Sequence, residues 1–377
     1  METIMQFNSK KIALTVVASA CACVAQAQQA SNVEIYGQVG LSVTSKNHQT
    51  AADGKLTELA TNTINVSHLG FRGREDLGNG LTALFRLESS MGPDSGLIGK
   101  PNGGAFFDRQ SYMGLSSTQW GSITLGRQFH AFIDRTIRTL DIYQVGSANA
   151  HVVPLALYGV NRFSGNDNRS NRTVKYRLDQ STGLQAGFSY SLGGIAGSDS
   201  KGSSYSYDLA YVGSDFNVGA GLVSYNGLNT QTNSAVLPKH EMWGFGGSMK
   251  LGAFTPYLAY YNATLDSATT AGLNTQVNKI TSAGVAWKAN PAVLVRAAYY
   301  TDKGTDLNNV TGRNGKKDTV VLSAEYFLSK RTSLNAIVAN NNLTGGYMQE
   351  ATYTAALGRN PTASGVQFYS LGINHQF

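Results

Sequence analysis

The sequence repeatedly places charged side chains two positions apart, which puts them on one face of an extended strand. Arg72 and Arg74 form one such pair, and Lys175 and Arg177 form another. The same alternation gives the basic residues Arg72, Arg74, Arg86, Lys175, Arg177, Lys250 and Arg296 and the acidic residues Glu34, Glu88, Asp208 and Glu325. Clustered Arg and Lys side chains favour anions. We therefore expect these side chains to share one polar surface that is basic on balance and interacts with anions through its charge.

Sequence patterns for catalysis are not found. The histidines are scattered, at His48, His68, His130, His151, His240 and His375. They form no H-E-x-x-H or H-x-H pair, no serine stands in G-x-S-x-G, and no G-x-G-x-x-G precedes a helix. We predict that the protein is not an enzyme and holds no cofactor or metal. The alternative is a nucleophile and a base that meet only in the folded chain.

The elements that must position these charges are strands. Apolar and polar residues alternate strictly over 33–43, 184–192 and 320–328, and no helical period competes over a long window. Charged residues are only 14% of the 377, and the chain has 42 Gly and 19 Tyr but 7 Pro. This composition is typical of a strand-rich and turn-rich protein. One face of each strand is therefore apolar and aromatic, and the other is polar or glycine.

The first 27 residues resemble an export signal that is later removed. Lys10 and Lys11 precede an apolar run from Ile12 to Val24, and Ala25-Gln26-Ala27 is a small-x-small cleavage site. A buried N-terminal helix is the alternative. We predict residues 1–27 as the signal peptide and 28–377 as the mature domain. Both cysteines of the chain, at positions 21 and 23, would leave with the signal.

The connections between strands are short and long in alternation. Short turns are expected at 76–80, 116–121, 179–183, 214–215, 252–253, 290–291 and 329–332. Longer polar segments are expected at 44–62, 89–105, 129–170, 193–204, 227–239, 265–276, 303–316 and 344–363. Eight long loops and seven short turns require sixteen strands, the layout of an all-β, antiparallel transmembrane barrel. A soluble β-sandwich is the alternative. No run of Lys or Arg exceeds two residues, which argues against nucleic acid as a partner.

Five stretches of the chain, in order, carry a family resemblance. They are Ile35-Tyr36-Gly37, Leu69–Gly73 with Glu75–Leu81, Arg109–Leu115, Gly121–Gln128 and Leu371–Phe377. Together they resemble the trimeric general porins of Gram-negative bacteria, most closely the beta-proteobacterial (Neisseria/Burkholderia-like) branch. The resemblance implies a homotrimer in outer-membrane lipid, whose third long loop folds inward and narrows a water-filled channel. It also implies that Phe377, with Ile373, Leu371 and Tyr369, is the signal read by the barrel-assembly machinery; a plain lipid-facing strand is the alternative.

The third loop, 129–170, is the longest, and it is too apolar for a fully solvated segment. Asp134 and Asp141 are its acidic candidates for the constriction, although Arg135 and Arg138 stand beside them. The family's usual Pro-Glu-Phe-Gly stretch is missing from this loop. We expect the loop to pack against the inner wall of the barrel.

On the wall, the resemblance assigns constriction roles to Arg127 and Arg177, and His68 stands where relatives often carry Arg. Arg127 is in phase with Leu125, so it reaches the lumen only if its strand bulges. The predicted pore lining thus consists of Arg127, Arg177, His68 and the loop residues Asp134 and Asp141, together with Arg72, Arg74, Arg86, Lys175 and Glu88. They predict a mild preference for anions; ordinary solvated charges without selectivity are the alternative.

The resemblance thus implies passive diffusion of small hydrophilic solutes and inorganic ions across a Gram-negative outer membrane. Two alternatives remain open. One is a substrate-specific channel for phosphate, carboxylates or sugars, in which inward Arg and Tyr form a binding ladder. The other is an adhesin-type barrel that acts through its surface loops.

Overall fold

A computed structural model describes residues 32–49, 52–64, 66–99, 105–143, 149–158, 168–179, 181–227, 238–267 and 274–377. The predicted signal peptide, 1–27, lies outside the described residues. The strands of the first half are β1 (Asn32–Gln49), β2 (Gly54–Thr61), β3 (His68–Gly78), β4 (Leu81–Gly92), β5 (Leu97–Ile98), β6 (Gln110–Ser117), β7 (Gly121–Phe129), β8 (Arg169–Leu178) and β9 (Gly183–Ser191). Those of the second half are β10 (Ser204–Val212), β11 (Phe216–Asn226), β12 (Lys239–Met249), β13 (Phe254–Leu265), β14 (Gln276–Asn290), β15 (Val293–Thr305), β16 (Gly315–Phe327), β17 (Thr332–Gly345) and β18 (Gly365–Gln376).

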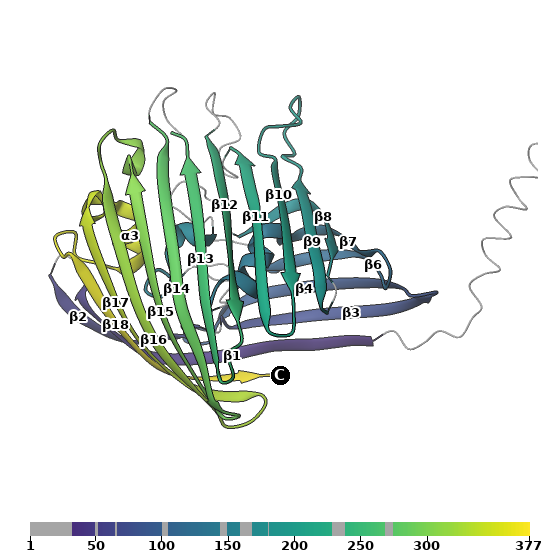
Figure 1. Cartoon of the computed structure of the whole chain (residues 1–377), viewed down its shortest axis with the longest axis horizontal. Helices are drawn as coiled ribbons and strands as arrows, with labels where there is room; N and C mark the ends of the chain where they lie inside the picture. The colour runs from purple at the N-terminus through teal and green to yellow at the C-terminus, as the bar shows by residue number, and fades with distance from the viewer. Residues whose placement is uncertain are drawn as a thin grey trace, which may run out of the picture.

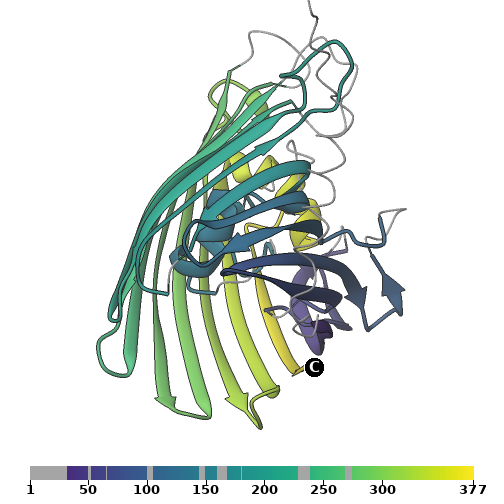
Figure 2. The ribbon, with the colours of Figure 1, turned by 90° about the vertical axis from the view of Figure 1, so that its right-hand side faces the viewer.

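The described strands close into one antiparallel ring, seen from two sides in Figures 1 and 2. β1 pairs with β18 on one side, and with both β2 and β3 on the other. β2 and β3 share one position because they pair with different halves of β1, and β5 pairs with the end of β4 outside the ring. Sixteen strand positions remain among the described residues, which confirms the predicted sixteen-stranded barrel.

The two faces of the wall differ in polarity, as the alternation predicts. On β9, Leu184 and Phe188 are 55% and 50% exposed, whereas Gln185 and Ser189 between and beside them are buried. A strand that faces hydrocarbon on one side and polar groups on the other needs this pattern. The exposed apolar side chains therefore form the outer surface in contact with lipid, and the polar side chains face the other way.

One predicted loop is wrong. The segment 44–62 was expected to be a long loop, but β1 continues to Gln49 and β2 begins at Gly54. Its Ser, Thr and Lys residues do not alternate with apolar residues clearly enough to predict strands. In the structure they nevertheless pair across the two strands, and Lys46 forms a 2.7 Å ion pair with Glu58. The chain instead leaves the sheet after Thr61, between β2 and β3.

The remaining described elements are short helices. They are α2 (Ala131–Arg135), η2 (Thr136–Leu140), η3 (Leu155–Tyr158), η4 (Leu307–Asn309), η5 (Gly346–Gln349) and α3 (Ala351–Leu357). No helix in the described part of the chain is long and apolar enough to cross a membrane. Apolar side chains of α2, η2 and the segment 149–158 are buried against wall residues such as Val223, Met242 and Ile280. The described part of the third loop therefore buries apolar side chains together with residues of the wall.

Candidate functional site

Helix α2 docks on three neighbouring strands, through serine side chains of β9 and β10 and through a glycine of β11. The backbone amide of Ala131 donates to Ser189 Oγ (3.2 Å), and that of Phe132 donates to Ser206 Oγ (2.9 Å). The ring of Phe132 lies over Gly221, where a Cβ atom would come within 2.5 Å of Phe132 Cδ2. Ser189 and Ser206 alternate with exposed apolar residues of β9 and β10, so α2 lies on the polar face of the wall.

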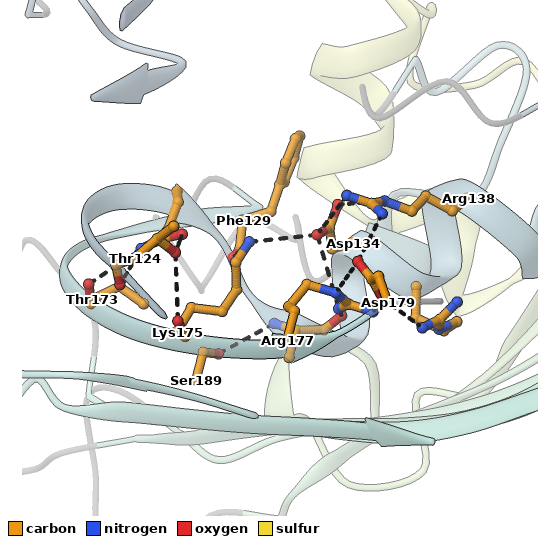
Figure 3. A network of polar contacts seen from close by, with 12 residues as sticks. Thr124, Phe129, Asp134, Arg138, Thr173, Lys175, Arg177, Asp179 and Ser189 are labelled. Carbon is orange, nitrogen blue, oxygen red and sulfur yellow. Dashed lines mark hydrogen bonds and ion pairs between the residues drawn. The ribbon is translucent and has the colours of Figure 1, made fainter. Parts of the chain in front are cut away.

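An ion-pair network joins α2 and η2 to β8 and β10, and most of it is drawn in Figure 3. Arg135 Nε donates to Asp208 Oδ1 at 2.8 Å, and Arg177 Nη1 donates to Asp208 Oδ2 at 3.1 Å. The Asp179 carboxylate forms ion pairs with Arg177 Nε and Arg138 Nη1, whose distances from Asp179 Oδ2 are 2.9 and 3.1 Å. We call Asp134, Arg135, Arg138, Lys175, Arg177, Asp179 and Asp208 the α2 network. It holds four basic and three acidic side chains.

Asp134 lies between the helix and the wall. Lys175 Nζ donates to its Oδ2 at 3.4 Å, and Arg138 Nε donates to its Oδ1 at 3.2 Å. Burial alone would raise the pKa of the Asp134 carboxyl, but Lys175, Arg138 and Arg177 outweigh this effect and hold that pKa well below its usual range. Asp134 is therefore an anion that neutralises the basic wall by direct contact.

A second cluster lies on β1, β3 and β4. Glu88 is at its centre: Tyr36 Oη donates to its Oε2 at 2.9 Å, and Arg109 Nε donates to its Oε1 at 2.5 Å. Arg86 Nε is 3.8 Å from the same carboxylate. The guanidinium groups of Arg72 and Arg86 both lie over the Tyr36 ring, at 4.8 and 5.1 Å. This tyrosine cluster (Glu34, Tyr36, His68, Arg72, Arg86, Glu88 and Arg109) also has more basic than acidic side chains.

Arg109 is a residue of this cluster that the charge pattern missed. It stands just before β6, where the alternation used to sort charges has not yet begun. Its position at the start of the Arg109–Leu115 motif was the available signal. His68, which was predicted, lies beside the cluster with its ring edge-on to Tyr36 at 6.0 Å, and its Nδ1 is 2.9 Å from Val66 O.

The structure does not bring Arg127 into either cluster. Arg127 would reach the lumen only if β7 bulged, but the extra residue lies in β8, where Gly126 pairs with Thr173 and Gln128 with Ser170. The alternation of β7 is therefore unbroken, and Gln128 rather than Arg127 shares the polar face with Thr124, to which it is hydrogen-bonded at 2.6 Å. Arg127 Nε donates instead to the backbone oxygen of Asp108, at 2.6 Å.

Two further predicted residues lie apart. Asp141 is buried, and Tyr300 Oη donates to its Oδ1 at 2.8 Å. Tyr300 is on β15, which lies several strands away from β8 and β10 of the α2 network. Arg74 is exposed and lines a polar cleft of about 430 Å³ with Asp76, Thr82 and neighbouring serines at the end of β3. Arg74 thus stands at a rim of the barrel.

The predicted assembly residues share one face of the last strand. Tyr369, Leu371 and Ile373 are 47%, 67% and 47% exposed, and Phe377 follows in the same phase. Phe377 and Gly37 exchange backbone hydrogen bonds of 3.1 and 3.2 Å, which help to close the ring. In the described part of the chain, no three His, Cys, Asp or Glu residues gather as a metal site would require.

The sequence matches the model of a family described as Gram-negative porin over residues 13–346. It is 30% identical over 212 residues to an outer membrane porin protein of Bordetella pertussis, covering 53% of this chain and 52% of that one. It is 31% identical over 222 residues to the major outer membrane protein P.IB of Neisseria meningitidis, covering 57% of each. The chain thus spans about half the length of these curated relatives.

Among solved structures, the fold is similar to an anion-selective porin from Comamonas acidovorans, with a TM-score of 0.72 at 20% identity, over 92% of this chain and 100% of that one. It is also similar to the OmpT outer membrane protein of Vibrio cholerae in a trimer form, with a TM-score of 0.65 at 14% identity, over 93% and 100%. These likenesses are likenesses of fold.

Proposed function

Because the chain belongs to the Gram-negative porin family, we propose that it is a general diffusion pore with a mild preference for anions. The protein is an outer-membrane β-barrel of a Gram-negative bacterium. Small hydrophilic solutes and inorganic ions cross it down their gradients, and no cofactor or catalytic step takes part. The observation that carries the proposal is a closed sixteen-position ring whose outer face is apolar and whose other face carries two basic clusters.

The third loop sets the width of this pore in our proposal. Helix α2 rests on the polar face of the wall through Ser189, Ser206 and the α2 network. A segment held on that face occupies part of the cross-section through which solutes pass. The pore is therefore narrower at the level of α2 than the ring of strands alone would leave it.

The anion preference comes from the basic side chains that remain in contact with solvent. The side chains of Arg72, Arg86 and Arg138 are 47%, 32% and 52% exposed. Lys175 and Arg177, also predicted to line the pore, are buried in ion pairs with Asp134 and Asp208. Arg72, Arg86 and Arg138 are ion-paired too, with Glu34, Glu88 and Asp134, but a passing anion can contact their exposed guanidinium groups. Lys175 and Arg177 act on it only through a weaker residual field.

A planar-bilayer recording under a KCl gradient tests the function and the sign of its selectivity. We expect stepwise conductance and a reversal potential on the chloride side. A reversal potential on the potassium side would keep the pore and overturn the assignment of charges. A correctly folded, heat-modifiable barrel that never conducts would refute the pore and favour a role of the surface loops.

We also propose that the protein assembles as a homotrimer, as the similar OmpT protein of Vibrio cholerae does in its trimer form. Crosslinking in mild detergent should then give trimers, and recordings should give conductance steps in groups of three. Only monomers in both measurements would exclude it.

The mature chain should begin at residue 28, which mass spectrometry measures. Removal of Phe377 should slow recognition by the barrel-assembly machinery, which a membrane-insertion assay measures.

A further inference from the structure

The second half of the third loop is packed under the last long segment before β18. Leu155 and Ala150 of that loop share a buried apolar cluster with Tyr347, Tyr353 and Leu357. Tyr347 belongs to η5, and Tyr353 and Leu357 belong to α3. Two segments almost 200 residues apart in the sequence therefore pack together on the barrel.

The hydroxyl group of Tyr353 connects the loop to the wall. The backbone amide of Leu155 donates to Tyr353 Oη at 2.9 Å, and Tyr353 Oη lies 3.3 Å from Asp302 Oδ2 on β15, to which it donates. Burial raises the pKa of the Tyr353 phenol well above its usual value, so the hydroxyl keeps its proton and can serve both bonds.

The wall holds the backbone of the same loop segment at two further points. Lys317 Nζ donates to the backbone oxygen of Ala150 at 3.2 Å, and Asn341 Nδ2 donates to that of His151 at 3.1 Å. The His151 ring stacks on Phe368 with centroids 4.6 Å apart. Lys317 Nζ also lies over the Tyr353 ring, 5.1 Å from its centroid.

Helix α3 has a rigid base from which to hold the loop. The Glu350 side chain accepts the backbone amide of Tyr353 at 2.7 Å. The buried Arg359 donates through Nη2 to the backbone oxygen of Met348 at 2.9 Å and to Thr354 Oγ1 at 2.8 Å. The helix is thus tied at both ends by contacts that do not involve the third loop.

We propose that the segment 346–363 is a latch that positions the third loop, with Tyr353 as its positioning residue. The latch fixes residues 149–158 on the wall while the α2 network fixes the start of the loop, and releasing it widens the pore. This inference rests on the proposed pore function. It means that a segment between β17 and β18, on the side of the long loops, controls a constriction formed elsewhere in the chain.

The substitution Tyr353→Phe tests the latch, because it removes the hydroxyl and keeps the ring. Loss of these hydrogen bonds should shift the ratio of docked to released loop by about tenfold. In single-channel records we expect longer dwell in a noisier, larger conductance level, and in vesicles faster entry of large neutral sugars. Hydrogen exchange at 149–158, followed by mass spectrometry, should speed up by a similar factor.

Tyr326→Phe is the matched control, since Tyr326 is 51% exposed on the outer face of β16 and its change should leave all three measurements unaltered. Asn341→Ala, which removes the separate anchor at His151, provides a second variant if Tyr353→Phe does not give a heat-modifiable barrel. If the wild type conducts and the folded variant has wild-type noise, sugar entry and exchange, the latch is wrong. If the wild type does not conduct, the pore is wrong, and exchange alone still tests the contact.

Discussion

Glu88 is the single carboxylate on which three basic or phenolic groups of the tyrosine cluster converge. Replacing it with glutamine removes one negative charge and keeps a polar group of the same size for Tyr36 and Arg109. We expect Glu88→Gln to move the reversal potential further toward chloride, because Arg86 and Arg109 lose their counter-charge. The variant should also unfold more easily, by about 3 kcal/mol, as buried charges left without a partner are costly.

Glu58→Gln is the control for this prediction, because the Glu58 side chain on β2 is 40% exposed and pairs with Lys46 of the neighbouring β1. That change should leave stability nearly unaltered. A Glu88→Gln channel with an unchanged reversal potential, or one displaced toward potassium, would show that the tyrosine cluster does not face the permeating ions.

His151 gives the latched segment a dependence on pH. Burial lowers the pKa of its imidazole to about 3, with smaller effects of Lys46 and Lys317 in the same direction. A released, solvated imidazole has a pKa of about 6.5. Above that value both states are neutral and docking is at full strength. As pH falls from about 6.5 toward 3, the released segment takes up the proton first, and the docked state loses stability, by about 2 kcal/mol at pH 5.

Channel noise should accordingly rise between pH 7 and pH 5 in the wild type. His151→Gln should remove this rise, and His375→Gln, at the far end of β18, should not. Noise that increases equally in all three proteins over this range would assign the effect to another group.

At the scale of elements, the seat of α2 depends on a glycine of β11. A Cβ atom at Gly221 would come within 2.5 Å of both Phe132 Cδ2 and the backbone oxygen of Tyr207. We expect Gly221→Ala to push α2 off the wall, at a cost of about 1–3 kcal/mol. Entry of large neutral sugars into vesicles should become faster. Gly54→Ala is the control, since a Cβ there has open space around it; equal sugar entry in the two variants would mean that α2 does not set the pore width.

The sequence predicted the strands and the facing of their side chains better than it predicted their contacts. Alternation is a local property, so it could assign Arg72 and Arg86 to one face; in the structure both guanidinium groups lie over the ring of Tyr36. Burial of Lys175 and Arg177 depends on α2 packing across β8–β10, which no local pattern contains. Whether Arg127 reaches the polar face depends on which strand carries the extra residue, and that strand is β8 rather than β7. The hairpin at 44–62 depends on pairing of polar residues across β1 and β2.

At the scale of the whole molecule, the question is which charges act on a permeating ion. The chain has 30 Lys and Arg against 23 Asp and Glu, so a general positive field is expected along any water-filled path. Exposed charges are screened by salt, with a Debye length of about 30 Å at 0.01 M and about 3 Å at 1 M, whereas buried pairs are screened much less.

Chloride preference should therefore be strong at low salt and fade toward 1 M KCl if the exposed Arg72, Arg86 and Arg138 produce it. Reversal potentials at a fixed tenfold gradient, recorded from low to high mean concentration, measure this change. Arg86→Gln should weaken the low-salt preference most, and Arg331→Gln, in the short turn before β17, should weaken it least. A preference that persists unchanged at 1 M, and that survives Arg86→Gln, would instead assign selectivity to the buried α2 network, where Lys175 and Arg177 lie between α2 and the wall.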